Sequence, residues 1–382
     1  MNEQVATTAE TRRAGTAGLA WGYNNKGGLG AAGTAQALRP IPVTLPGDVA
    51  DVQGGSDFTV ALTASGQVFT WGGNQWGQLG DGSVRHRFAP HQVVLEDNPH
   101  IVAIAAGQDH VLALARHGLV FAWGRNHHGQ LGDGTREDRC APVAVAVPGA
   151  GSVTQVAAGN SCSFALSSSG IVQAWGHSIP FGATLTGLPE PGGAQAGSAA
   201  ATAVTRPRPL ALPKAVAVTA VDAGQRHLVV LTGEGQVLTF GLTAAGRTAS
   251  ERLPVNHAWG QVTSISAGDN HTVALTGTGV VLAWGANNFG QLGNGSTTGQ
   301  DTPVQVHIPD LRGRVVQVIA GGDSVLARTD TDGVYAWGHG GFGQHGTGGT
   351  DHGQRPEPVT LPGHAKIHGL YAGRYHCFAT TG

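Results

Sequence analysis

Charged and phenolic side chains recur at one kind of place in this chain, within two residues of a glycine that follows an apolar run. These residues are Asp57, Asp109, Arg226, Asp269, Asp323, Arg374 and Tyr375. A carboxylate can act as a general acid or base, and an arginine can hold an oxyanion or a carboxylate. The same charges can instead hold a polar ligand or the charged side chains of a protein partner. For each aspartate alone, stabilisation of a turn is the competing interpretation, whereas arginine and tyrosine are not turn-forming residues.

Other motifs with chemical meaning are weak. Two glycine runs, 28–33 and 338–343, fit the dinucleotide pattern G-x-G-x-x-G, but neither opens a predicted helix, so both are interpreted as repeat glycines. His110, His227, His271 and His376 share one repeat position and are expected to stabilise a turn by local hydrogen bonds. No paired C-x-x-C, H-E-x-x-H, G-x-S-x-G or phosphate-binding loop is present. We therefore expect neither a metal nor a cofactor.

The elements that carry these residues are copies of one unit, seen most clearly in residues 66–82. Each copy contains an aromatic residue followed by glycine, and successive copies are 44 to 65 residues apart. The aromatic residues of these pairs are Trp21, Trp71, Trp123, Trp175, Phe240, Trp284 and Trp337. Such a period is the signature of solenoids, propellers and repeat arrays.

Within each copy, four short β-branched or alternating runs are separated by glycine-rich turns, as in 271–276 and 141–147. No run of helical length has a 3.6-residue period, so the sequence predicts an all-β, seven-bladed β-propeller of four-stranded blades. The residues left at the two ends add up to one further repeat. We expect 369–380 to supply the inner two strands of the last blade, and 18–22 with 41–45 to supply its outer two. Residues 1–14 are predicted to be a flexible leader and 15–382 a single domain.

The pattern Ala-Gly-x-x-His, an apolar strand and Trp-Gly-x-Asn-x-x-Gly-Gln-Leu-Gly-x-Gly resembles the regulator of chromosome condensation repeat. The copies at 107–134 and 268–295 match it at nearly every position. This resemblance implies a seven-bladed propeller. It implies several functions, since the family includes nucleotide exchange factors, chromatin binders and β-lactamase inhibitors. Similarity to the β-lactamase-inhibitory propellers would place partner contacts on the face that carries the Ala-Gly-x-x-His loops.

Composition narrows the choice of partner. Charged residues make up 12% of the chain, against about 25% in typical domains, and the net charge is −2. No basic field favours nucleic acid or an anionic membrane, and no apolar run is long enough to span a bilayer. The three cysteines form no disulfide framework, and Cys162 and Cys377 are predicted to be buried thiols. We expect a monomeric cytoplasmic protein, and the excess of arginine over lysine with abundant alanine and glycine favours a bacterial source.

The loops after the aromatic-glycine pairs lie on the same face as the charged positions, because both kinds of loop leave the same end of an antiparallel blade. Trp76, His177, Phe289 and Phe342 are aromatic or imidazole side chains in these loops and are added to the candidate binding residues. The distance from the aromatic residue to the next strand's proline is 19 residues in three copies, 32 after Trp175 and 14 after Phe240. The longer loop contains an insertion at 183–205, a candidate lid.

Two functions remain open. The first is an interaction module that recognises a protein partner through this face. The alternative is a cofactor-independent enzyme or small-molecule binder, for example a cyclase or isomerase, with its pocket at the channel mouth under the 183–205 insertion. In that case Asp57, Asp109 or Asp323 would be the acid or base, and Arg226 or Arg374, with Tyr375, would complete the site.

Overall fold

The computed structural model describes residues 16–149, 151–177, 203–212, 216–225, 227–242, 248–252, 259–363 and 366–382. These residues form β-strands joined by turns, arranged as seven four-stranded antiparallel sheets. Among them, no helix is long and apolar enough to cross a membrane. The predicted leader 1–14 and residues 183–202 of the insertion lie outside the described ranges, and Ala203 to Thr205 belong to a strand.

The sheets are the blades of a propeller, numbered here in chain order. Blade 1 contains β3 (Val49–Gly54), β4 (Phe58–Thr63), β5 (Val68–Gly72) and β6 (Arg87–Gln92). Blade 2 contains β7 (Ile101–Ala106), β8 (His110–Ala115), β9 (Val120–Gly124) and β10 (Arg139–Val145). Blade 3 contains β11 (Val153–Ala158), β12 (Cys162–Ser167), β13 (Val172–His177) and β14 (Ala203–Pro209). Blade 4 contains β15 (Val218–Ala223), β16 (His227–Thr232), β17 (Val237–Leu242) and β18 (Thr248–Arg252).

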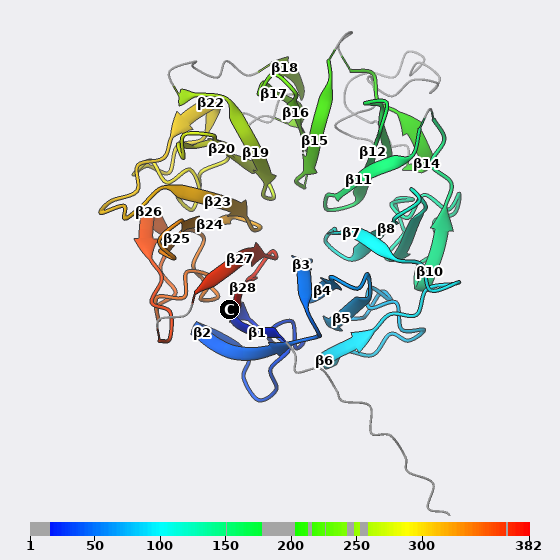
Figure 1. Cartoon of the computed structure of the whole chain (residues 1–382), viewed down its shortest axis with the longest axis horizontal. Helices are drawn as coiled ribbons and strands as arrows, with labels where there is room; N and C mark the ends of the chain where they lie inside the picture. Colours follow the sequence, from blue (N-terminus) through cyan, green and yellow to red (C-terminus); the bar gives the residue numbers. More distant parts are fainter. Residues whose placement is uncertain are drawn as a thin grey trace, which may run out of the picture.

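Blade 5 contains β19 (Val262–Ala267), β20 (His271–Thr276), β21 (Val281–Gly285) and β22 (Gln300–Gln305). Blade 6 contains β23 (Val315–Ala320), β24 (Ser324–Thr329), β25 (Val334–Gly338) and β26 (Gly353–Pro358). Blade 7 is built from both ends of the chain, from β27 (Ile367–Ala372), β28 (His376–Thr381), β1 (Thr16–Tyr23) and β2 (Gln36–Leu45). In every blade the first strand in this order lies nearest the centre of the ring (Figure 1).

Ring closure is therefore confirmed. β1 pairs with β28, with Trp21 opposite Cys377 and Gly18 opposite Thr380. The two ends of the chain share one sheet, and the ring has no exposed first or last blade. Each blade therefore has neighbouring blades on both sides, although the outermost strand of every four-stranded sheet keeps one free edge.

The glycine of each aromatic-glycine pair is required by the backbone. Gly124 has φ +100°, in the left-handed region that favours glycine, and a Cβ there would lie 2.5 Å from the carbonyl oxygen of Asp109. The chain can thus turn sharply out of β9 while staying in contact with the loop between β7 and β8. This contact joins the two kinds of loop on one face of the blade.

The apolar core lies between neighbouring blades. One cluster, for example, includes Leu112 of blade 2, Phe164 of blade 3 and Leu228 of blade 4, all fully buried. The tryptophan of one blade also donates its indole Nε1–H to a backbone carbonyl in the preceding blade's loop, as Trp123 does to Gln78 at 3.0 Å. The other pairs are Trp21 with Gln344, Trp71 with Gly28, Trp175 with Gln130 and Trp337 with Gln291. We call these five loops between third and fourth strands the regular loops. Each of them is hydrogen-bonded to the tryptophan of the next blade.

The repeat histidines also connect blades, so the expectation of a purely local hydrogen bond is wrong. The Nε2 atom of His110 lies 2.9 Å from Oγ of Ser163 in blade 3, and that of His376 lies 2.8 Å from Oγ1 of Thr59 in blade 1. His227 contacts Thr272 in the same way at 2.9 Å. Each pair joins a histidine to the hydroxyl of the next blade's second strand.

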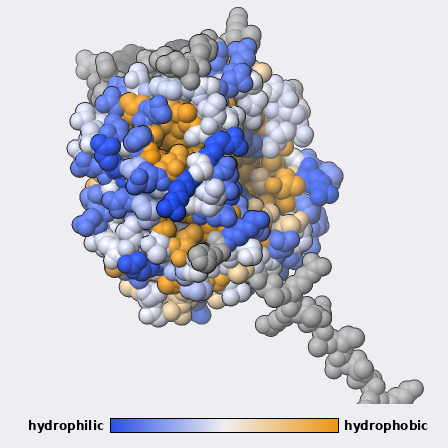
Figure 2. Space-filling view, turned by 60° about the vertical axis from the view of Figure 1, so that its left-hand side comes forward, coloured by the Kyte–Doolittle hydropathy of each residue, from blue (hydrophilic) through white to orange (hydrophobic). Residues whose placement is uncertain are grey.

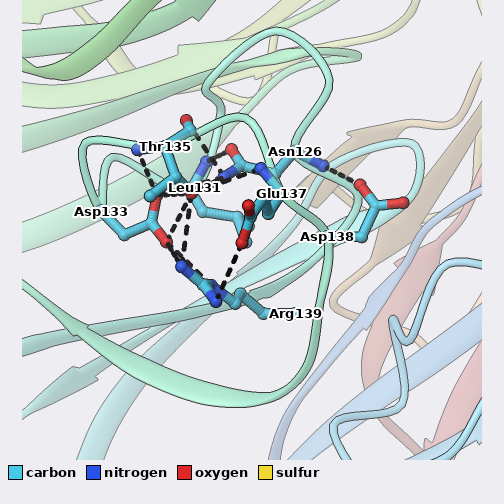
Figure 3. A network of polar contacts seen from close by, with 7 residues as sticks. All are labelled: Asn126, Leu131, Asp133, Thr135, Glu137, Asp138 and Arg139. Atoms are coloured by element: carbon cyan, nitrogen blue, oxygen red, sulfur yellow. Dashed lines mark hydrogen bonds and ion pairs between the residues drawn. The ribbon is translucent and has the colours of Figure 1, made fainter.

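The loop after Trp123 shows how the regular loops hold their shape (Figure 3). Asn126 Oδ1 accepts a hydrogen bond from the Leu131 amide at 2.9 Å, and its Nδ2 donates to Asp133 at 3.2 Å. Arg139 of β10 donates from Nε to Asp133 at 2.9 Å. Buried Asn74 and Asn287 make the equivalent contact with Leu79 and Leu292. These loops have fixed backbones and can present side chains in defined positions.

Candidate functional site

The loops between the first and second strands of the blades surround the mouth of the central channel. Backbone hydrogen bonds link several of them to neighbouring blades, for example from Ser56 N to Gln108 O at 3.0 Å and from Arg374 N to Gly55 O at 3.0 Å. The channel below has a volume of about 490 Å³. We call the face formed by these loops and by the loops between third and fourth strands the rim.

Two of the predicted rim aspartates are paired with cations that the sequence analysis did not single out. Lys26 Nζ lies 2.8 Å from Asp57 Oδ2, and Arg125 Nη1 lies 3.3 Å from Asp109 Oδ2. Burial raises the pKa of Asp109, and the charge of Arg125 opposes this rise. Lys26 comes from the neighbouring blade 7, so its ion pair crosses a blade boundary.

Arg374 reaches from blade 7 past blade 6 to blade 5, where its Nη2 lies 2.7 Å from Asp269 Oδ2. A Cβ on Gly322 would come within 2.7 Å of the Arg374 side chain, so this glycine leaves room for the crossing. Asp323 accepts a hydrogen bond from Gln291 at 3.1 Å. Burial and the nearby Asp269 carboxylate raise the pKa of Asp323 to about 6.

Among the described residues, the structure therefore brings only some of the predicted rim charges together. Arg374 forms an ion pair with Asp269. Lys26 forms one with Asp57, and Arg125 forms one with Asp109. Arg226 lies outside the described residues.

Aromatic and imidazole rings form a continuous cluster on the rim over blades 5, 6 and 7, which we call the aromatic belt. Its members are Tyr23, Phe289, His339, Phe342, His352 and Tyr375. Phe342 lies at the centre, with ring centroids 5.2 Å from Tyr23, 5.1 Å from Tyr375 and 5.7 Å from His339. Phe289 extends the belt through His339 at 4.7 Å. The guanidinium of Arg374 lies 5.3 Å from the Tyr375 ring centroid, so the belt ends on a charged group.

A smaller cluster lies on the rim over blades 1 to 3. Arg125 is placed over the indole of Trp76 at 4.5 Å, and His127 contacts the edge of the same ring at 5.2 Å. Next to it, His128 and His177 have ring centroids 4.7 Å apart. Burial lowers the pKa of His128, and the charge of the neighbouring Arg125 lowers it further. The predicted residues Trp76 and His177 thus belong to this second cluster and not to the belt.

Tyr23, Arg125 and His339 were not among the residues predicted from the sequence, although their position in the repeat indicates them. Each directly follows an aromatic-glycine pair, and the residue at this position differs in chemistry from blade to blade. The sequence indicates Lys26 and Gln291 less clearly as site residues, because only the folded loops bring their side chains to the rim aspartates.

Among the described residues, the rim does not form a catalytic arrangement. Asp57, Asp109 and Asp269 are held in ion pairs, and no nucleophile lies beside a free base there. Two further carboxyl groups, Asp51 and Asp222, line the channel, and burial raises the pKa of each to about 6. The carboxylate of Asp222 accepts hydrogen bonds from the backbone amides of Ala223 and Ala267, each at 2.8 Å. The pocket is the channel itself, and the enzyme alternative has no support in this geometry.

Comparison with known proteins agrees with the fold. The family model described as the regulator of chromosome condensation (RCC1) repeat matches residues 19–62, 65–114, 117–166, 278–328 and 331–380, well over half of the chain. The ultraviolet-B receptor UVR8 of Arabidopsis thaliana is 32% identical over 330 residues, which cover 86% of this chain and 62% of UVR8. The E3 ubiquitin-protein ligase HERC2 of Homo sapiens is 29% identical over 94% of this chain, but only 6% of HERC2 is covered. The chain thus spans less than two thirds of the length of these relatives.

Solved structures show the same architecture. Human WBSCR16 superposes with a TM-score of 0.80 at 22% identity, covering 96% of this chain and 98% of that protein. Prp20p of Saccharomyces cerevisiae superposes with a TM-score of 0.80 at 21% identity, covering 97% and 92%. At these identities the likeness shows the fold alone. On the matched repeats and the seven closed blades, this chain belongs to the regulator of chromosome condensation repeat family.

Proposed function

We propose that this propeller is a protein-binding module and that the rim over blades 5, 6 and 7 is its contact surface. The observation that carries the proposal is the aromatic belt, with Arg374 held between the Tyr375 ring and the Asp269 carboxylate. Tyrosine, tryptophan and arginine are the residues most enriched among those that dominate binding energy at protein interfaces.

The rim is also suited to binding because its side chains are held before a partner arrives. The guanidinium of Arg374 is held by an ion pair at 2.7 Å and lies over the Tyr375 ring. The rings of the belt pack against each other in T-shaped and tilted arrangements, so little side-chain freedom remains to be lost. A surface ordered in this way binds at a lower entropic cost.

The side of the molecule shown in Figure 2 has no single continuous apolar face. On the side shown in Figure 2, apolar patches are separated by hydrophilic residues. Exposed large apolar residues such as Val94, Val102 and Leu119 come from different segments. Scattered residues of this kind are normal on soluble proteins and do not indicate a second interface.

The relatives are consistent with a binding role without naming the partner. Prp20p is described by its binding to Gsp1p and histones, and another structure contains yeast RCC1 (Prp20) bound to Kap60. The partner of this chain is proposed to be a protein, because a net charge of −2 gives no basic surface for nucleic acid. We also propose that the chain acts as a monomer, since both ends of the chain are used within its own seventh blade and no blade is left without neighbours.

Affinity capture from cells of the source organism tests the proposal. Proteins retained by the wild type should be lost at least about tenfold with Arg374→Ala and with Tyr375→Ala, the loss expected for residues worth more than about 1.4 kcal/mol. Leu119→Ala is the matched control, because Leu119 is an exposed apolar residue in a turn between second and third strands, on the opposite face. The melting temperature of each variant is measured as well, because Arg374 and Asp269 form a partly buried ion pair whose loss lowers stability, and capture is compared at a temperature at which every variant is folded. Equal capture by all three variants would show that the belt is not the contact surface.

A further inference from the structure

The loop of blade 6 between β25 and β26 differs at its centre from the other regular loops. In the other four, an asparagine accepts a hydrogen bond at 2.9 Å from the backbone amide of a buried leucine, as Asn287 does in blade 5. In blade 6, Gly340 replaces the asparagine and His345 replaces the leucine. We call residues 339–352 the histidine loop, because imidazoles take the place of the amide.

The direction of one hydrogen bond shows that His339 is neutral. Oε1 of Gln344 accepts the backbone N–H of Phe342 at 2.8 Å, so Nε2 is the end of this amide that carries hydrogens. That Nε2 lies 2.9 Å from Nδ1 of His339. Since the amide can only donate there, Nδ1 of His339 is an acceptor and carries no proton.

His352 is used in the same way. Its Nδ1 accepts a hydrogen bond from the backbone N–H of Gly340 at 3.2 Å, so this ring is also neutral, with its proton on Nε2. At the equivalent place in blade 2, the amide of Asn126 donates to the carboxylate of Asp138 at 2.7 Å. The position therefore requires an acceptor, and blade 6 supplies one that takes up a proton in weak acid.

The two imidazoles are packed together with Phe289 of blade 5. The ring centroids of His339 and His352 are 4.8 Å apart at an interplanar angle of 32°, and Phe289 lies 4.7 Å and 4.9 Å from them. Burial lowers the pKa of His339, because the protonated ring would lose its hydration. Two imidazolium charges at this distance would also repel each other. Protonation thus turns both acceptors into donors and places like charges side by side.

The histidine loop also carries the centre of the aromatic belt. The Gln344 side chain joins His339 to the backbone of Phe342. The Phe342 ring in turn packs against Tyr23 and Tyr375 of blade 7. When Nδ1 of His339 is protonated, the Gln344 amide must turn away from it, and the Phe342 amide then loses its acceptor. The position of the central ring of the belt therefore depends on a neutral imidazole.

No carboxylate among the described residues forms an ion pair with either ring. The other titratable or charged groups on the elements around them are Asp323, His345, Asp351, Arg355, Arg374 and Tyr375, and residues 286–299 of the blade 5 loop contain none. Burial lowers the pKa of His345 to about 4, so this ring stays neutral above pH 5. Asp323, with its pKa raised to about 6, loses its charge in the range where an imidazolium would need it.

We propose that the histidine loop makes the aromatic belt a pH-dependent contact surface, which holds its protein partner at neutral pH and releases it in acid. The partner binds while His339 and His352 are neutral, and proton uptake by these rings frees Phe342 from its fixed position. The bound form holds fewer protons than the released form, so affinity falls as the pH falls below about 6.5, by about tenfold per pH unit for each proton. This inference rests on the proposed function, because it describes how binding at the belt is regulated.

The first test needs no partner. In the full-length chain, NMR of ¹⁵N-labelled imidazoles should show the proton of both rings on Nε2 at pH 7.5. Protection of the Phe342 amide against hydrogen exchange should fall about tenfold between pH 7.5 and pH 5.5. The Trp76 amide is the matched control, because it donates to Gln78 at 2.9 Å in the same way, and no histidine among the described residues is bonded to that glutamine. Its protection should change less than about twofold.

Matched variants separate the two imidazoles from other titrating groups. His339→Asn and His352→Asp keep an acceptor at each position without an imidazole, and aspartate is the residue that blade 2 uses at the second position. In the double variant, protection of the Phe342 amide should change less than about twofold between pH 7.5 and pH 5.5. Asp323→Asn should leave the tenfold fall of the wild type in place.

The second test adds a wash at pH 5.5 to the affinity capture. The wild type should keep at most about a tenth of the protein that it bound at pH 7.5. The double variant should keep more than half of what it bound itself at pH 7.5, whatever that amount is. Because each protein is compared with itself, any direct contribution of the two histidines to binding cancels.

Four outcomes would overturn the inference. The first is a proton on Nδ1 of His339 at pH 7.5, and the second is an equal fall in Phe342 protection in the wild type and the double variant. The third is a partner that stays bound to the wild type at pH 5.5, which would leave the proposed function standing. The fourth is no capture at pH 7.5 although the loop responds to acid, which would mean that the proposed function itself is wrong.

Discussion

At the scale of single residues, the rim aspartates show how the surroundings determine a role. Asp57, Asp109 and Asp269 have the sequence context of turn-forming acids, yet each holds a cation from another loop or blade. The closed ring brings their partners Lys26, Arg125 and Arg374 within reach of the carboxylates. These aspartates are therefore positioning residues for the cations that the rim presents.

The four repeat histidines form a second group at this scale. Burial lowers their pKa values to about 3 for His110 and His271 and to about 4 for His227 and His376, so all are neutral at pH 7. In the unfolded chain a histidine has a pKa near 6.5. As the pH falls below 6.5, the unfolded chain takes up protons that the folded chain does not, and folding loses free energy.

Substitution of His110 tests this linkage. The destabilisation caused by His110→Ala should be greatest above pH 6.5 and should shrink by about 1.4 kcal/mol per pH unit between pH 6 and pH 4. The measurement is the free energy of unfolding from denaturant titrations of wild type and variant at several pH values. Phe58→Ala is the control, because Phe58 occupies the same repeat position in blade 1 without a titratable group. A pH-independent cost of His110→Ala would contradict the lowered pKa.

At the scale of elements, the loop of one blade and the tryptophan of the next act as one unit. Five indoles are bonded to a loop carbonyl of the preceding blade. The sequence follows the same rule, since blade 4 carries Phe240 after the blade whose loop has lost Gly-Gln-Leu-Gly. Departures from the repeat in one blade thus have consequences in its neighbour.

Two tryptophan-to-phenylalanine changes measure this coupling. Trp123→Phe should cost about 1 kcal/mol more than Trp284→Phe, because it leaves the Gln78 carbonyl without its donor, whereas the Trp284 indole has no acceptor among the described residues. Both changes remove a similar volume from a buried site, so the difference in unfolding free energy isolates the hydrogen bond. Equal costs would mean that the loop carbonyl contributes nothing to the contact between blades.

At the scale of the whole molecule, the ring depends on the pairing of its two ends. β28 is hydrogen-bonded to β1, and Trp21 is packed with Phe378 and Leu370 in one buried cluster. Without β27 and β28, this cluster would be exposed and blades 6 and 1 would each lose their neighbour. The closed ring makes distant parts of the chain depend on one another.

Truncation tests that dependence. A chain that ends at Lys366 lacks β27 and β28 and should lose its cooperative thermal transition and its near-ultraviolet circular dichroism. Supplying residues 367–382 at the N-terminus before β1, as a circular permutant, should restore both, because the same four strands then form blade 7. A stable truncated chain would show that the ring tolerates an open blade.

The sequence by itself determined the fold: seven aromatic-glycine copies, four strands in each and a last blade shared by the two ends. It could do so because the same short-range pattern is repeated, and each copy predicts its strands from local alternation and turn residues. It also located the rim, because loops at the same position of every repeat must leave the same face of the ring.

Only the tertiary structure decided which rim residues act together. Arg374 meets Asp269 across an intervening blade, the aromatic belt joins rings from residues 23 to 375, and His110, His227 and His376 contact hydroxyls in the next blade. In the part of the chain that the structure describes, the buried Nε1 of Trp284 has no hydrogen-bond partner, and only comparison with the bonded indoles of the other blades makes this difference visible. The physical reason is that these contacts lie between blades, where the partner of a side chain is set by closure of the ring and not by its neighbours in the sequence.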